Sequence, residues 1–137
     1  MDRKLFEIVL VVKDLEGAAR FYRDAVGLEP ITPPDDGWAG FRVGEPETNS
    51  WLGLRKGTLL YEQFSPLPEG RRFGPTHFAL RVPVAARSEA LSRLERAGVT
   101  VYGPEAGGGG RFEGESYYFF DPDANLVEFW FPAAETT

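Results

Sequence analysis

The sequence contains two copies of one pattern, and this internal repeat limits the fold more than any other feature. A strand-like run at residues 7–12 is echoed at residues 77–82, 70 residues later along the chain. Each run is followed by a helix-like stretch that ends at a glycine, Gly27 in the first copy and Gly98 in the second. A repeat this regular predicts two copies of one supersecondary unit.

The ends of the two copies also correspond, because residues 51–62 align without a gap with residues 117–128. Both segments end in a carboxylate, at Glu62 and Glu128, while the opening strands begin with Glu7 and His77. These four polar residues form two equivalent pairs in otherwise apolar strands. The pattern predicts a site built at a pseudo-twofold axis.

Each copy is predicted to run strand, helix, strand, strand, strand. In the first copy we expect a strand over 4–12, a helix over 15–26 with Asp14 as its N-cap, a turn-rich loop over 30–36, and further strands. These further strands are expected at 38–43, 50–55 and 58–64. The second copy is expected to have strands near 99–102, from 112 or 117 to 120, and 126–131, with a turn over 121–125.

The predicted fold class is α+β, with two βαβββ modules that form a half-open barrel of mixed sheet with helices outside. A length of 137 residues favours one domain, with modules over about 1–65 and 74–137 and a linker over about 66–75. Side chains alternate between the two faces of a strand, so the larger apolar residues should pack under the helices. Glu7 and His77 are then left on the concave side.

Composition excludes several functions. A net charge of −6 and a pI near 4.8 argue against nucleic acid or an anionic membrane as a partner. The absence of cysteine rules out a thiolate nucleophile and a cysteine metal site. The opening apolar run is too short to span a membrane and lacks the layout of a signal peptide, so we expect a cytoplasmic protein.

Four segments carry a resemblance to a known family: residues 7–15, 21–28, 76–80 and 118–128. In this combination they resemble the vicinal oxygen chelate superfamily, which includes glyoxalase I, bleomycin resistance proteins, extradiol dioxygenases, fosfomycin resistance enzymes and methylmalonyl-CoA epimerase. The resemblance covers almost the whole chain. It implies a single glyoxalase/bleomycin-resistance-like domain over 1–137, and relatives of this kind commonly assemble as homodimers.

The resemblance also implies a metal site, because metal ligands in the superfamily come from the first and last strands of each module. Carried over by position, the ligands are Glu7, Glu62, His77 and Glu128, although His or Gln is commoner at the place of Glu7. Three carboxylates and one imidazole suit a divalent ion such as Ni, Mn, Co, Mg or Zn. Glu128 or Glu7 could serve as the catalytic base beside a metal-bound carbonyl.

The single histidine limits this site further. A 2-His-1-carboxylate iron centre needs two histidines, which argues against an extradiol dioxygenase and against the usual His-His-Glu site of fosfomycin thiol transferases. The arginine that glyoxalase I would place four residues after its first ligand falls at Val11. We expect Arg81 to lie on the same face as His77, where it could neutralise an anionic substrate.

Two functions remain open. The first is a glyoxalase-like metal-dependent lyase or isomerase that acts on a small oxygenated carbonyl substrate by metal-assisted proton abstraction. The alternative is a metal-free protein that binds a small molecule or antibiotic, as bleomycin resistance proteins do. For either function, Trp51 and Phe119 are candidate residues for stacking on a planar ligand, although core packing is the other explanation for such aromatic residues.

Overall fold

The fold consists of two units of the same topology, Met1–Gly74 and Pro75–Thr137. The computed structural model describes residues 5–35, 37–48, 50–57, 76–106 and 113–133. Each unit combines one helical region with a four-stranded mixed sheet in the order βαβββ. The predicted α+β class with two βαβββ modules is therefore confirmed. The proposed linker at 66–75 lies outside the described residues, and the single-domain interpretation stays a prediction.

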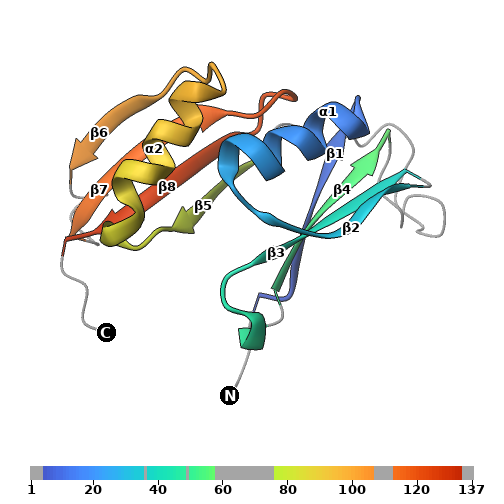
Figure 1. Ribbon diagram of the computed structural model, residues 1–137, viewed down its shortest axis with the longest axis horizontal. Coiled ribbons are helices and arrows are strands. Elements are labelled where there is room, and N and C mark those ends of the chain that lie inside the picture. The colour runs from blue at the N-terminus through green and yellow to red at the C-terminus, as the bar shows by residue number, and fades with distance from the viewer. Residues whose placement is uncertain (1–4, 36, 49, 58–75, 107–112, 134–137) are drawn as a thin grey trace, which may run out of the picture. The chain divides into compact units, whose positions relative to one another are not determined.

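Unit 1 opens with a strand that lies parallel to the last described strand of the unit. The elements are β1 (Glu7–Val12), α1 (Leu15–Arg20), a π-helical continuation (Phe21–Val26), β2 (Glu29–Asp35), β3 (Trp38–Val43), a short 3-10 helix (Pro46–Thr48) and β4 (Ser50–Lys56). The strand order is β1-β4-β3-β2, and β3 is antiparallel to both β2 and β4 (Figure 1).

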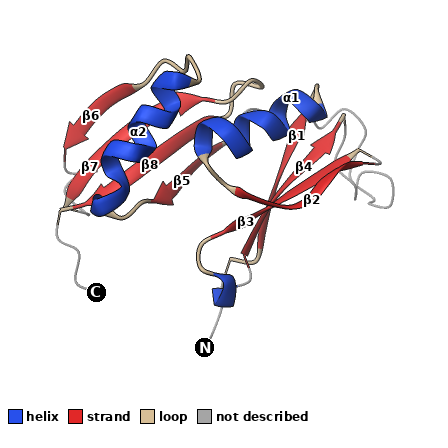
Figure 2. Ribbon diagram, in the orientation of Figure 1, coloured by secondary structure: helices blue, strands red, loops and turns tan. Residues whose placement is uncertain are grey.

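Unit 2 repeats this arrangement. It contains β5 (His77–Arg81), a short 3-10 helix (Val84–Ala86), α2 (Arg87–Arg96), β6 (Tyr102–Ala106), β7 (Gly114–Phe120) and β8 (Leu126–Pro132). The strand order is β5-β8-β7-β6, with β5 parallel to β8 (Figure 2). Neither helical region in the described part of the chain is long and apolar enough to cross a membrane.

The limits of the first helix are set by local chemistry. Asp14 has an extended backbone, and its side chain accepts a hydrogen bond of 3.1 Å from the amide of Gly17, as the predicted N-cap requires. The helical region ends at Gly27, whose φ of 88° is the left-handed conformation that glycine adopts without a side-chain clash.

Strand parity separates a core face from an open face in each sheet. In unit 1, Leu10, Leu54 and Phe41 are buried on the face that α1 covers. In unit 2, Phe129 and Leu94 belong to the corresponding core. Glu7 and His77 are exposed on their strands, on the opposite face from these buried residues. The prediction that the apolar residues pack under the helices is confirmed for the described strands.

One expectation about unit 1 is wrong, and another stays a prediction. Residues 30–36 were expected to form a loop because they are rich in proline, but residues up to Asp35 belong to β2. The strand pairs irregularly with β3 and lies at the edge of the sheet, where a missing backbone N–H is tolerated. The strand expected at 58–64 lies outside the described residues.

The strand register shows which positions of the two copies correspond, and they differ from those of the predicted alignment. Glu7 pairs with Trp51 in β1 and β4, and His77 pairs with Leu126 in β5 and β8. Gly53 lies two residues after Trp51 in β4, and Glu128 lies two residues after Leu126 in β8. Gly53 is therefore the residue of unit 1 that corresponds to Glu128. The ungapped alignment of residues 51–62 with 117–128 is therefore wrong, because residue 51 lies in the fourth strand of its unit and residue 117 in the third.

Candidate metal centre

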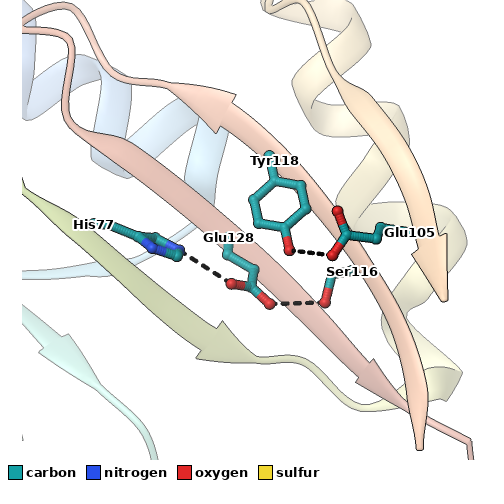
Figure 3. A network of polar contacts seen from close by, with 5 residues as sticks. All are labelled: His77, Glu105, Ser116, Tyr118 and Glu128. Atoms are coloured by element: carbon teal, nitrogen blue, oxygen red, sulfur yellow. Dashed lines mark hydrogen bonds and ion pairs between the residues drawn. The ribbon is translucent and has the colours of Figure 1, made fainter. Parts of the chain in front are cut away.

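The polar centre of unit 2 is a contact between the single histidine and a carboxylate of the neighbouring strand. His77 opens β5 and Glu128 lies two residues into β8, and the two strands are parallel and adjacent. His77 Nε2 lies 3.1 Å from Glu128 Oε1 (Figure 3). The Glu128 side chain is 15% exposed and that of His77 is 52% exposed, so the pair lies at the surface of the open face with its carboxylate mostly covered.

The second oxygen of the Glu128 carboxylate is held from the other side. Ser116, on β7, donates a hydrogen bond of 2.7 Å from its hydroxyl to Glu128 Oε2. Ser116 is only 1% exposed, so its hydroxyl is shielded from competing water. The carboxylate is thus oriented by Ser116 at one oxygen, while the other oxygen faces His77.

Tyr118 and Glu105 extend the network across β7 and β6. The Tyr118 hydroxyl donates to Glu105 Oε1 at 3.3 Å, and the Tyr118 ring lies 6.2 Å from the His77 ring between centroids. Burial raises the pKa of Tyr118, and the negative charges of Glu128 and Glu105 raise it further, whereas a hydrogen bond with Ser116 acts in the opposite direction. Tyr118 is therefore a neutral donor at physiological pH.

The position of His77 depends on the turn that precedes β8. Asn125 is 5% exposed, and its Oδ1 accepts hydrogen bonds from the amide of Thr76 at 2.9 Å and from the Thr76 hydroxyl at 3.1 Å. Asp121, also buried, accepts from the Asn125 amide and side chain at 2.8 and 2.9 Å. The turn therefore connects Thr76, the residue before His77, to Asn125, three positions before Glu128.

The donor atoms present fit a divalent ion at this pair. Imidazole nitrogen and carboxylate oxygen are ligands that Mn, Co, Ni and Zn accept. Two adjacent ligands of an octahedral ion, each roughly 2.1 Å from the metal, lie about 3.0 Å apart. The observed separation of 3.1 Å matches that spacing. Within the described ranges no three or more His, Cys, Asp and Glu residues gather as a possible metal group, so the described part of unit 2 would offer an ion two protein ligands.

The other residues predicted for the metal site have different placements. Glu7 belongs to unit 1, where it is exposed at the start of β1. Glu62 lies outside the described residues. Its expected equivalence with Glu128 is not supported, because the register assigns that place to Gly53. The four-residue ligand set as a whole stays a prediction.

The residues predicted to contact substrate divide into two groups. Arg81 lies on the same face of β5 as His77, with its guanidinium 5.8 Å from the centroid of the Trp130 ring. Trp51 lies on the open face of the unit 1 sheet, paired with Glu7. Phe119 does not face the site, because it is fully buried on the opposite face of β7, with its ring 5.0 Å from that of Phe129 between centroids. Its assignment to substrate binding is wrong.

Sequence reasoning missed Ser116 and the role of Tyr118. Both alternate along β7 with the core residues Tyr117 and Phe119, which is the period of a strand with two different faces. That alternation indicates that Ser116 and Tyr118 share one face of β7. Only the pairing of Tyr118 with Glu128 shows that this is the face that carries the site.

Fold and site together define a protein built on paired βαβββ modules with a histidine and a glutamate on adjacent strands. The chain belongs to the Glyoxalase/Bleomycin resistance protein/Dioxygenase superfamily, whose family model matches residues 4–129. The predicted family resemblance is therefore confirmed.

Relatives within the superfamily include enzymes. The chain is 27% identical over 128 residues to the glutathione transferase FosA of Serratia marcescens, covering 93% of this chain and 80% of that protein. It is 25% identical to a mutant of the fosfomycin resistance protein FosX of Listeria monocytogenes, crystallised with Mn(II) and 1S,2S-dihydroxypropylphosphonic acid. That likeness has a TM-score of 0.65 and covers 95% of this chain and 90% of the other.

A second solved structure supports the fold alone. Lactoylglutathione lyase from Agrobacterium tumefaciens is 24% identical, with a TM-score of 0.68, covering 95% of this chain and 94% of that chain. The relatives therefore include proteins named for different reactions. The reaction of this chain must be argued from its own residues.

Proposed function

We propose that the protein is a metal-dependent enzyme, a lyase or isomerase that acts on a small oxygenated substrate at a divalent ion held by His77 and Glu128. The observation that carries the proposal is the separation of 3.1 Å between His77 Nε2 and Glu128 Oε1. The hydrogen bond from Ser116 to the other carboxylate oxygen supports it, because ligating carboxylates are commonly oriented by such a neighbour.

A bound divalent ion would supply Lewis acidity, polarising a substrate carbonyl and stabilising an enediolate. As a metal ligand whose other oxygen is held by Ser116, Glu128 would not be free to act as the base. By its place in the family pattern, Glu7 of unit 1, whose side chain is exposed, is the candidate for the base that removes a proton beside the carbonyl, or for a third ligand. Arg81 would neutralise an anionic group of the substrate on the same face as His77.

The relatives indicate which metal and which substrates to offer first. A FosX protein was crystallised with Mn(II), so Mn²⁺ is the first ion to offer. The substrates to screen are 2-oxoaldehydes with glutathione, epimerisable thioesters, and fosfomycin with glutathione or water, because FosA is named as a glutathione transferase. The single histidine still distinguishes this ligand set from a His-His-Glu site.

The test is titration of chelator-treated protein with Mn²⁺ by isothermal calorimetry, together with elemental analysis after dialysis. We expect about one equivalent per chain for the native protein and loss of binding in His77→Ala and Glu128→Gln. Glu89→Gln is the matched control, because Glu89 is an exposed carboxylate on α2 that pairs with Arg93 within its own helix.

Absence of binding to Mn²⁺, Ni²⁺, Co²⁺, Zn²⁺ and Mg²⁺ would contradict the proposal. The contact between His77 and Glu128 would then be an ordinary ion pair or hydrogen bond, and metal-free binding of a small molecule or antibiotic would become the better explanation. Stoichiometric metal that survives both substitutions would show that the site lies elsewhere.

A further inference from the structure

Unit 1 has a pocket of about 300 Å³ that is lined by residues of the first helical region, β2 and β3. Its apolar floor is formed by Ala19, Pro30, Pro34 and Phe41. Phe41 is buried on the face of the sheet that α1 covers, whereas Glu7 lies on the opposite face. The pocket therefore shares no lining residue with the candidate metal centre.

The pocket exists because a small helix residue meets an irregular edge strand. Ala19 is 7% exposed, and its methyl group leaves space that a larger side chain would fill. β2 pairs irregularly with β3 on both sides of Thr32, and the compact rings of Pro30 and Pro34 border the gap. The volume is at the lower end of the range for small-molecule pockets, so the ligand it fits is small.

Charged side chains line the helix side of the pocket. Glu16 and Arg20 are four residues apart in α1, a spacing that puts both side chains on one face of the helix. Neither side chain forms an ion pair or hydrogen bond with the part of the chain that the structure describes. Arg23 differs, because its Nε and Nη2 donate to the two carboxylate oxygens of Asp24 at 2.7 and 2.9 Å. The pocket thus offers one carboxylate and one guanidinium to a ligand.

The helical region also changes its form where these charges lie. It is α-helical through Arg20 and π-helical over Phe21–Val26, and the Gly27 amide donates to the Tyr22 carbonyl five residues earlier. π-helical turns are rare and occur frequently at functional sites. In unit 2 the corresponding helix is α-helical over the whole of Arg87–Arg96. Among the described helices, the π-helical stretch is therefore specific to the unit that carries the pocket.

We propose that this pocket binds a free α-amino acid with an apolar side chain. The ligand carboxylate pairs with Arg20, whose planar guanidinium can donate two parallel hydrogen bonds to it. The ligand ammonium pairs with Glu16, and the ligand side chain covers the apolar floor. A ligand with only a carboxylate would place its charge beside that of Glu16, and a ligand with only an amine would meet Arg20, so the two opposite charges favour a zwitterion.

The test follows the backbone amide signals of the isotope-labelled full chain by NMR, with EDTA present so that no amino acid binds through a metal ion. The probes are L-leucine and three molecules that each lack one of its features. Isocaproate lacks the ammonium group, isoamylamine lacks the carboxylate, and glycine lacks the side chain. We expect leucine to shift the signals of Ala19 and Arg20 and to bind roughly tenfold more tightly than each of the other probes.

The variants Arg20→Gln and Glu16→Gln test the two charges separately. Both positions are exposed, so both variants should fold. We expect Arg20→Gln to weaken leucine binding roughly tenfold. Glu16→Gln should weaken leucine binding but strengthen that of isocaproate, because it removes a like charge. Arg96→Gln is the matched control, since Arg96 is an exposed arginine at the end of α2, and it should leave leucine binding unchanged.

The outcomes are independent of the proposed function, because the experiment contains no metal ion and no substrate. Leucine that causes no shifts, or that binds equally well to Arg20→Gln and Glu16→Gln, would overturn the site. Isocaproate that binds the native protein as tightly as leucine would overturn the assignment to an amino acid. Leucine binding in a protein that takes up no metal would support the site and contradict only the metal-dependent function.

Discussion

Asn125 reaches from the turn between β7 and β8 to Thr76, whose amide and hydroxyl both donate to its Oδ1, at 2.9 and 3.1 Å. Thr76 immediately precedes His77, and its carbonyl accepts from the amide of Leu126 at 2.8 Å. The start of β5 is thereby held in register with the start of β8. This contact is what places the imidazole beside Glu128.

Asn125→Ala should therefore lower both stability and metal affinity. It removes two hydrogen bonds to Thr76 and leaves the buried Asp121 carboxylate without its side-chain donor, a combined loss of about 2–3 kcal/mol in the free energy of unfolding. Urea denaturation measures this loss, and calorimetry with Mn²⁺ measures the weaker binding. Glu95→Ala, an exposed change on α2, should alter neither quantity; unchanged metal affinity in Asn125→Ala would show that the turn does not position His77.

Ser116→Ala should weaken Mn²⁺ binding by roughly 10–100-fold, the usual effect of removing a residue that orients a ligand. The hydroxyl that holds Glu128 Oε2 is lost, while the carboxylate itself remains. Ser116→Thr keeps the hydroxyl and should retain most of the affinity. The Mn²⁺ electron paramagnetic resonance spectrum should change in the alanine variant, a readout that a general loss of stability would not produce.

Tyr118 should lose its proton later than an exposed tyrosine during alkaline titration. Burial and the nearby carboxylates raise its pKa above the ordinary value of 10.0. The folded protein therefore holds this proton more tightly than the unfolded chain does. The resulting contribution to stability is complete below about pH 10 and is lost as the pH rises through the folded-state pKa.

Absorbance at 295 nm follows this ionisation. The native protein should show a late phase that Tyr118→Phe lacks, and the unfolding free energy of the native protein should fall more steeply than that of the variant above pH 10. A late phase that persists in Tyr118→Phe would assign it to another tyrosine.

Phe119→Ala should destabilise the protein by about 3–5 kcal/mol, the cost of removing a large aromatic side chain from a packed core. Phe119 is fully buried against Phe129, on the face away from Glu128. Provided the variant still folds, its Mn²⁺ stoichiometry should be unchanged. A stability close to that of the native protein would return Phe119 to the group of ligand-contacting candidates.

The sequence was sufficient to predict the elements whose periodicity is strong. β1, the first helical region with its Asp14 cap, and the turn before β8 all follow from the apolar pattern and from turn chemistry. β2 could not be predicted in this way, because its prolines resemble a loop until the neighbouring strand shows that it is an edge.

The site was harder to predict because faces and registers depend on pairing between strands. His77 and Glu128 were singled out by their places in the repeat, and the structure brings their side chains within 3.1 Å of each other. The ungapped alignment of the two copies failed because the connections within the units differ in length. It matched Glu62 with Glu128, whereas the strand register matches Gly53 with Glu128. Phe119 was misassigned because the parity of β7 can be fixed only against Glu128 in β8.

The prolines of β2 affect how readily this edge of the sheet can pair with another molecule. β2 is the edge strand of its sheet, and an edge with free backbone N–H groups can recruit a strand from another molecule. Pro30 and Pro34 cannot donate such hydrogen bonds, and the irregular pairing around Thr32 bends the strand out of a regular ladder. The same prolines that make this strand resemble a loop in the sequence therefore disfavour aggregation by edge-to-edge strand pairing at β2.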